Sequence, residues 1–317
     1  MTNRRGFTLT ELMMTVVLVS IIGLMLTMVL VRQSRFHRAI QDVSESRNRM
    51  RDIATIVPTD LRGVSTSQND ILAFGRDTLQ FRAFIGTSIV CDFASTTLID
   101  LPPKVLVSGD AYTAWINPPA AGDLAYIYDD GTQPGNADDS WTRFSISAVA
   151  SSTNSAWCPS TNNPAYTVAG DNAATRYRIT LATAANTATI KTGAVIRFAR
   201  EVRYSGYQAA DGQWYMGYQT CTPNASNTTP GTCGTTEVLA GPIKPMTSDT
   251  NTTGLFFRYW DKSGTEVTTA GNITKIARVD ICIRTDATSI RQAVSTKIST
   301  FTGGDSLRFS VAIRNRI

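Results

Sequence analysis

An uninterrupted apolar segment near the beginning of the chain is the feature that most restricts its fold. The 20 residues Leu12–Val31 include no charged side chain. As an α-helix they would span about 30 Å, which matches the hydrocarbon thickness of a bilayer. Glu11 stands at the edge of this segment. A carboxylate costs roughly 2.5–3.5 kcal/mol at the centre of a membrane and less near its surface, so we expect a membrane-spanning helix and a partner for Glu11.

The residues before this segment, Arg4–Glu11, combine a basic pair, a glycine, a phenylalanine and a glutamate. This arrangement resembles the class III signal of type IV prepilins and type II secretion pseudopilins. The resemblance implies that a prepilin peptidase cuts after Gly6 and that the new N-terminal residue, Phe7, is N-methylated. It also implies that Glu11, at the fifth mature position, pairs with the N-terminal amine of a neighbouring subunit. Other minor and major pilins and an inner-membrane assembly platform are the implied partners.

Two other readings of the N-terminus remain open. An ordinary secretory signal has a shorter apolar region, of about 7–15 residues, followed by a cleavage site of small residues. Here Arg32-Gln33-Ser34-Arg35 follows instead. A plain transmembrane anchor explains the length of the segment but not the position of Glu11. Basic residues on both sides leave the orientation undecided, and the resemblance supplies it, with the N-terminus inside and the body outside.

The apolar pattern predicts that the helix continues beyond the membrane. Residues spaced by three and four form one stripe, interrupted at Arg47: Phe36, Ile40, Val43, Met50, Ala54 and Val57. Pro58 disfavours helix at the residue before it, so we expect the helix to end at Val57. The predicted organisation is a leader over 1–6, a helix over 7–57 that spans the membrane at about 12–31 and is amphipathic over 32–57, and a globular body over 58–317.

The body alternates apolar and polar residues with the period of β-strands. The expected strands are Leu79–Ile85, Leu124–Tyr128, Arg143–Val149, Tyr177–Ala182, Ala194–Tyr204, Leu255–Asp261, Ile276–Arg284 and Leu307–Ile313. Asp211-Gly212 between aromatic residues predicts a hairpin, and we expect loops at 129–140 and 151–175. The predicted fold is α+β and pilin-like, a long N-terminal helix packed on an antiparallel β-sheet body.

The C-terminal third extends the resemblance. The segments Glu237–Ala240, Gly254–Gly264 and Val311–Arg316, with Leu61–Val64 after the helix, are similar to PilW-type minor pilins and GspJ-type pseudopilins. Major pilins usually carry a glycine and a proline at positions that Ser20 and Met28 occupy here. The chain is also about twice as long as a typical major pilin, so the resemblance favours a minor subunit. The stretch 90–175 resembles nothing we can name.

Charge and cysteine content favour an extracytoplasmic protein. Charged residues make up 17% of the chain, below the roughly 25% typical of soluble proteins. The net charge of +5 comes largely from the leader and from the segment 32–51, and DNA binding is an alternative that it leaves open. The five cysteines are Cys91, Cys158, Cys221, Cys233 and Cys282. Disulfides are expected in an oxidising compartment. Cys221 and Cys233, which bracket a short loop, are the best candidate pair, and an odd cysteine stays free or pairs between chains.

The sequence offers no catalytic set, cofactor motif or metal site. His37, the only histidine, lies in the helix, so a Ser/His/Asp triad lacks its base. Asp129-Asp130 and Asp138-Asp139 could hold calcium or be solvated loop carboxylates, and we favour the latter. The aromatic residues of 214–218 and 256–260 suit a sheet core better than a binding platform.

The sequence therefore predicts a minor pilin or pseudopilin that helps to prime or cap a type IV pilus. The alternatives are a tip adhesin, a DNA-uptake subunit and a type II secretion pseudopilin. The expected location is the inner membrane, crossed once with the body in the periplasm, and then a pilus at the cell surface.

Overall fold

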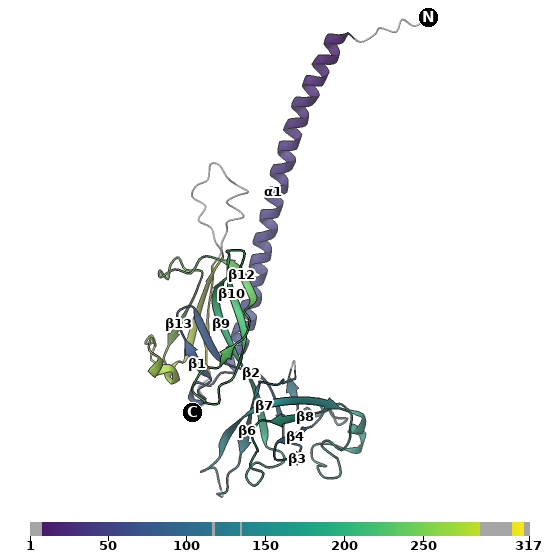
Figure 1. Cartoon of the computed structure of the whole chain (residues 1–317), viewed down its shortest axis with the longest axis vertical. Helices are drawn as coiled ribbons and strands as arrows, with labels where there is room; N and C mark the ends of the chain where they lie inside the picture. The colour runs from purple at the N-terminus through teal and green to yellow at the C-terminus, as the bar shows by residue number, and fades with distance from the viewer. Residues whose placement is uncertain (1–7, 116–117, 134, 286–305, 314–317) are drawn as a thin grey trace, which may run out of the picture.

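The computed structural model describes residues 8–115, 118–133, 135–285 and 306–313. A single long helix, α1 (Leu9–Arg62), leads into a body of antiparallel strands (Figure 1). The first half of α1 projects away from the body, and its last turns lie against β12 (Glu237–Ile243), β15 (Ser306–Ala312) and β2 (Thr78–Ile89). The predicted α+β, pilin-like architecture is confirmed.

Most strands belong to one branched sheet. Its main path runs through β1 (Ile71–Phe74), β2, β9 (Val195–Gln208), β6 (Leu124–Asp129), β7 (Ser140–Ser152), β8 (Arg176–Leu181), β4 (Leu98–Leu101) and β3 (Asp92–Ser95). Two further strands extend it from β9, namely β10 (Trp214–Thr222) and β12, while β11 (Thr232–Cys233) pairs with β10 and β5 (Ala114–Trp115) with β2. Short 3₁₀ helices η1 (Thr66–Gln68), η2 (Ala169–Ala173) and η3 (Ala270–Lys275) lie in the connections.

A separate three-stranded sheet completes the body. It consists of β13 (Leu255–Trp260), β14 (Arg278–Arg284) and β15. Alternate residues along each strand face the core, among them Phe257, Tyr259, Val279 and Ile281. This is the period-two pattern seen in the sequence, because successive side chains of a strand point to opposite faces.

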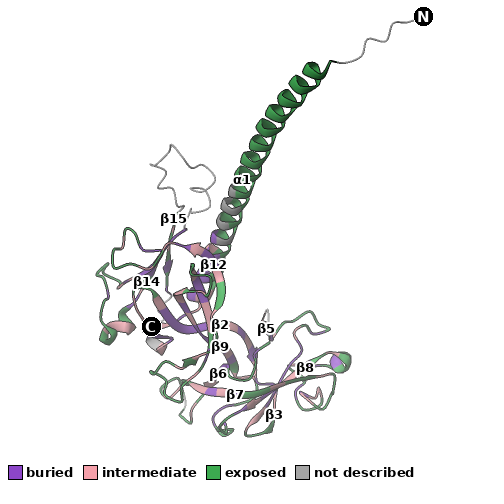
Figure 2. Ribbon diagram, turned by 45° about the horizontal axis from the view of Figure 1, so that its top comes forward, coloured by how far each residue is buried: buried purple, intermediate pink, exposed green. Residues whose placement is uncertain are grey.

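The body contains two hydrophobic cores, joined by the long strands β2 and β9 (Figure 2). The first core lies against the end of α1 and includes Ile53, Val57, Leu61, Phe81, Tyr204 and Phe257. The second includes Val90, Ile99, Ile127, Phe144, Ile179 and Phe198. Along its other edge, β9 pairs with β6 over Ile196–Ala199 and with β10 over Val202–Gln208. The sheet branches at this point, and each branch covers its own core.

The predicted end of the helix at Val57 is wrong, because α1 continues to Arg62 with Pro58 inside it. A proline removes one backbone hydrogen bond and disfavours helix before it, but packing can outweigh this local cost. Val57 and Leu61 are both fully buried in the first core. The Arg197 guanidinium also donates to the carbonyl oxygen of Gly63, directly after the helix, at 2.8 Å.

The amphipathic stripe packs on the body over a shorter stretch than predicted. Met50, Ile53, Val57 and Leu61 are buried, whereas Phe36 and Ile40 remain about half exposed, at 55% and 49%. The side chain of Val43 lies outside the described residues. Ile53, rather than Ala54, is the fully buried member of its turn. The spacing identified a helical face, but the position of the body decides which part of that face is covered.

The predicted strands all lie within observed strands or overlap them, and Asp211-Gly212 forms the turn between β9 and β10, with Gly212 at φ 79°. The stretch 90–175, for which the sequence offered no resemblance, supplies β3 to β7, which build much of the second core.

Candidate functional site

The beginning of α1 is held by a reciprocal pair of hydrogen bonds. The Glu11 amide donates to Thr8 Oγ1 at 3.3 Å, and the Thr8 amide donates to Glu11 Oε2 at 3.3 Å. This is a capping box, which the sequence Thr8-Leu9-Thr10-Glu11 displays in the form S/T-x-x-E. A carboxylate also suits the positive end of the helix dipole. Glu11 therefore has a partner within its own chain, which the sequence analysis did not foresee. Gly6 and Phe7 lie outside the described residues.

The surface of the helix beyond Glu11 is apolar and uncovered. Residues Leu9–Arg38 form a candidate membrane span that contains an 18-residue window with a mean hydropathy of 2.7, and none of that window is buried within the chain. Such a surface needs lipid or other apolar helices around it. The hydroxyls within it are satisfied locally, since Ser20 donates to the carbonyl of Val16 at 2.7 Å and Thr27 to that of Gly23 at 2.6 Å. Backbone acceptors thus remove the cost of placing these hydroxyls in hydrocarbon.

The other end of α1 is fixed to the body by polar contacts. Tyr204 on β9 donates to Asp60 at 2.6 Å, and burial raises the pKa of Asp60 although this hydrogen bond opposes the shift. Arg197 forms an ion pair with the fully buried Asp70 at 2.7 Å. Burial also raises the pKa of Asp70, against the attraction of Arg197. These contacts therefore join both the last turn of α1 and the connection after it to β9.

The structure bonds Cys221 to Cys233, which were the candidate pair, across β10 and β11. The loop between them folds over buried charged groups. Glu201 accepts a hydrogen bond from the Gly231 amide at 2.6 Å, and Arg82 donates to the Asn227 side chain at 2.8 Å. Both charged side chains are fully buried, and the loop adds to the partners that Gln80 and Asn69 also give them.

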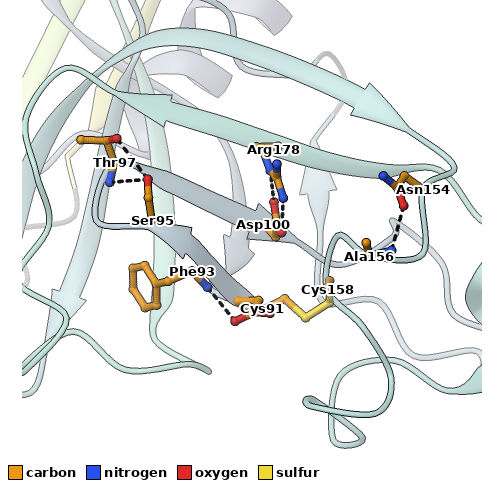
Figure 3. Close-up of polar contacts among 10 residues, drawn as sticks. Cys91, Phe93, Ser95, Thr97, Asp100, Asn154, Ala156, Cys158 and Arg178 are labelled. Carbon is orange, nitrogen blue, oxygen red and sulfur yellow. Dashed lines mark hydrogen bonds and ion pairs between the residues drawn. A yellow bond between two sulfur atoms is a disulfide. The ribbon is translucent and has the colours of Figure 1, made fainter.

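A second disulfide joins Cys91 to Cys158 in the other half of the body (Figure 3). These residues are 67 positions apart, and no local sequence pattern indicates that they pair. Arg178 lies near this bond and donates a hydrogen bond to Asp100 at 2.8 Å. Its guanidinium carbon also lies over the Trp157 ring, 4.4 Å from the ring centre. Cys282 is buried and unbonded.

In the acidic loop between β6 and β7, a carboxylate accepts hydrogen bonds from the backbone of the same loop. Asp138 accepts hydrogen bonds from the Thr132 and Gln133 amides, at 2.7 and 3.0 Å, and these bonds lower the pKa of Asp138. Tyr128 donates to Asp139. Within the described parts of the chain, no three His, Cys, Asp or Glu side chains are grouped as metal ligands.

The aromatic residues of the C-terminal third divide between two environments. Phe257 and Tyr259 belong to the first core, and Trp214 and Tyr218 pack against it. Trp260 lies on the opposite face of its sheet, where Arg278 covers its ring at 5.1 Å. The core interpretation therefore holds for most of this group.

One comparison with known proteins gives a match. Residues 1–27 match the family model described as the prokaryotic N-terminal methylation motif. No curated protein and no solved structure matches the chain. The motif implies processing by a prepilin peptidase and assembly with other pilins, and proteins that carry it are structural rather than enzymatic. Together with the exposed apolar helix, the motif supports membrane anchoring and a type IV pilin-like family for this chain.

Proposed function

We propose that this chain is a minor pilin, or pseudopilin, that helps to prime or cap the assembly of a type IV pilus. The observation that carries the proposal is the uncovered apolar helix that projects from the body and whose first part lies within the methylation motif. A surface of this kind is stable in a bilayer and equally stable in a bundle of similar helices. The helix can therefore leave one environment for the other without exposing its side chains to water.

In this proposal a prepilin peptidase cuts between Gly6 and Phe7, and Phe7 becomes the methylated N-terminus. The chain then crosses the inner membrane once, with its body in the periplasm, until it is incorporated at the cell surface. Glu11 pairs with the N-terminal amine of a neighbouring subunit and sets the axial position of the helix. The Thr8–Glu11 contacts are exposed and 3.3 Å long, so the carboxylate can exchange them for a charged partner.

Two features favour a minor subunit over the bulk subunit of a filament. The helix carries no proline before Pro58, so its membrane half has no built-in point of local melting. The body has two cores, and only the first contains residues of α1. A subunit of this bulk suits a few positions at the end of a filament better than every position along it.

Mass spectrometry of the protein from its native cells tests the proposal. We expect a mature chain that begins with N-methylated Phe7. Quantitative immunoblots of sheared pili should show this chain far below the major subunit in amount, and loss of the chain should reduce the number of pili. An intact Met1 start in cells with an active prepilin peptidase would contradict the processing. An amount equal to that of the major subunit would contradict the minor role.

A further inference from the structure

A cavity of about 320 Å³ lies where the end of α1 meets β2, β7 and β9. Figure 1 shows this end of the helix beside β2 and above β6 and β7, between the two halves of the body. Its lining includes Arg62, Gly63, Gln68, Phe84, Trp141 and Arg197. The volume is at the lower end of the range for ligand pockets, which often form at the junction of two packed units.

Two aromatic rings at the cavity are only partly covered. Phe84 and Trp141 each expose 39% of their surface, although they come from different strands. Trp141 also packs against Tyr128, with ring centres 5.6 Å apart, and this contact helps to hold its ring in place. Half-exposed rings in a concave site favour an apolar group between them.

The polar side chains that remain available at the cavity are hydrogen-bond donors. Arg197 already donates hydrogen bonds to Gly63, Gln68 and Asp70, at 2.8, 2.9 and 2.7 Å. Its bond to Oε1 of the Gln68 side chain leaves the amide nitrogen of that side chain to donate. Arg62 is exposed and makes no ion pair within the described residues. The cavity therefore combines one unpaired cation, one amide donor and two apolar rings.

We propose that this cavity binds the C-terminal carboxylate of a partner polypeptide whose last side chain is apolar. The carboxylate would accept hydrogen bonds from Arg62 and Gln68, since a carboxylate accepts only and can take two from one guanidinium. The last side chain would lie against Phe84 and Trp141. A sugar fits less well, because each of its hydroxyls also needs an acceptor. Capture of a terminal carboxylate is a recurring mode of peptide recognition. The inference does not depend on the proposed pilus function.

Binding of short fluorescent peptides to the full chain in an uncharged detergent tests the proposal. One peptide ends in leucine with a free carboxylate, and the matched peptide has the same sequence with a C-terminal amide. We expect the free acid to bind about tenfold more tightly, because the amide loses a charge-assisted contact. Arg62→Gln should bind both peptides equally. Trp141→Ala should weaken both, and Arg258→Gln, at an exposed site on β13, should change neither.

Three outcomes would overturn the proposal. The first is equal affinity of the wild-type chain for the acid and the amide. The second is a preference for the acid that persists in Arg62→Gln. The third is displacement of the peptide by glucuronate at concentrations similar to those of the unlabelled peptide, which would indicate an acidic sugar instead. All three are measured on purified protein, so they are distinct from any failure in pilus assembly.

Discussion

Tyr204, a fully buried residue of β9, donates a hydrogen bond to Asp60 in the last turn of α1 at 2.6 Å. Asp60 lies two residues after Pro58, so this contact holds the last turn of the helix, beyond the proline. The bond joins the sheet that both cores share to the helix that leaves the body. Its loss should therefore loosen the connection between the helix and the body.

Replacing Tyr204 by phenylalanine should destabilise the protein by about 1–3 kcal/mol, because Asp60 loses its hydrogen-bond donor while it remains half-buried. Urea unfolding monitored by tryptophan fluorescence measures this change. Tyr126→Phe is the matched control, since the Tyr126 hydroxyl is buried without a partner among the described residues. Its removal should leave stability unchanged or slightly higher. Equal losses in the two variants would contradict this account.

The raised pKa of Asp60 predicts a pH dependence of stability. Between the ordinary pKa of an aspartate and the raised pKa of Asp60, the folded state binds more protons than the unfolded state. The contribution of Asp60 to the free energy of unfolding is thus largest at low pH and falls as the pH rises through its folded pKa. Asp60→Asn keeps an acceptor for Tyr204 and removes this titration. The variant should match or exceed wild-type stability at neutral pH, and its profile should be flatter above about pH 4, the pKa of an unperturbed aspartate.

Replacing only one member of the Arg197–Asp70 ion pair should strongly destabilise the protein. Arg197→Met leaves the fully buried Asp70 carboxylate without its cation, and a loss of about 3–5 kcal/mol is expected at neutral pH. The double variant Arg197→Met with Asp70→Asn should lose less, because the unpaired charge is gone. Arg258→Met removes an exposed arginine 4.0 Å from Glu266 and should cost at most about 1 kcal/mol. Chemical denaturation of the four proteins measures these differences, and a double variant weaker than Arg197→Met would refute the argument.

The two disulfides should differ in how much each stabilises the folded protein. In the chain-entropy model the stabilisation grows with the number of residues enclosed, which predicts about 3 kcal/mol for Cys221–Cys233 and about 4 kcal/mol for Cys91–Cys158, with separations of 12 and 67. Replacing each pair by alanine and measuring thermal unfolding by calorimetry gives the comparison. A greater loss from the short-loop pair would indicate that its tethering of Glu201 and Arg82 matters more than entropy.

Substitutions of Glu11 can separate its two roles. Glutamine preserves the capping box but removes the charge, whereas alanine removes both. If the charge pairs with a neighbouring subunit, both variants should be cleaved and yet fail to enter pili. Immunoblots of membrane and pilus fractions measure this. Normal incorporation of Glu11→Gln alone would assign Glu11 to helix capping and would exclude the charge-pairing role.

The helix, the strands and the single-face alternation of β13, β14 and β15 follow from local patterns, so they could be predicted from neighbouring residues. The Asp211-Gly212 turn could also be predicted locally, because the turn needs a positive φ and glycine readily adopts one. The capping box is also a local pattern, since Thr8 and Glu11 stand in the S/T-x-x-E spacing that specifies it.

Features that depend on distant residues could not be predicted in this way. The order of residues between 8 and 62 specified an apolar helix with a carboxylate at its beginning, since that requires only composition and spacing. Only the folded chain decided that Pro58 stays helical, that Cys91 meets Cys158, and that Arg62, Phe84 and Trp141 line one cavity. Each of these outcomes depends on contacts between segments that lie far apart in sequence, which neighbouring residues alone do not determine.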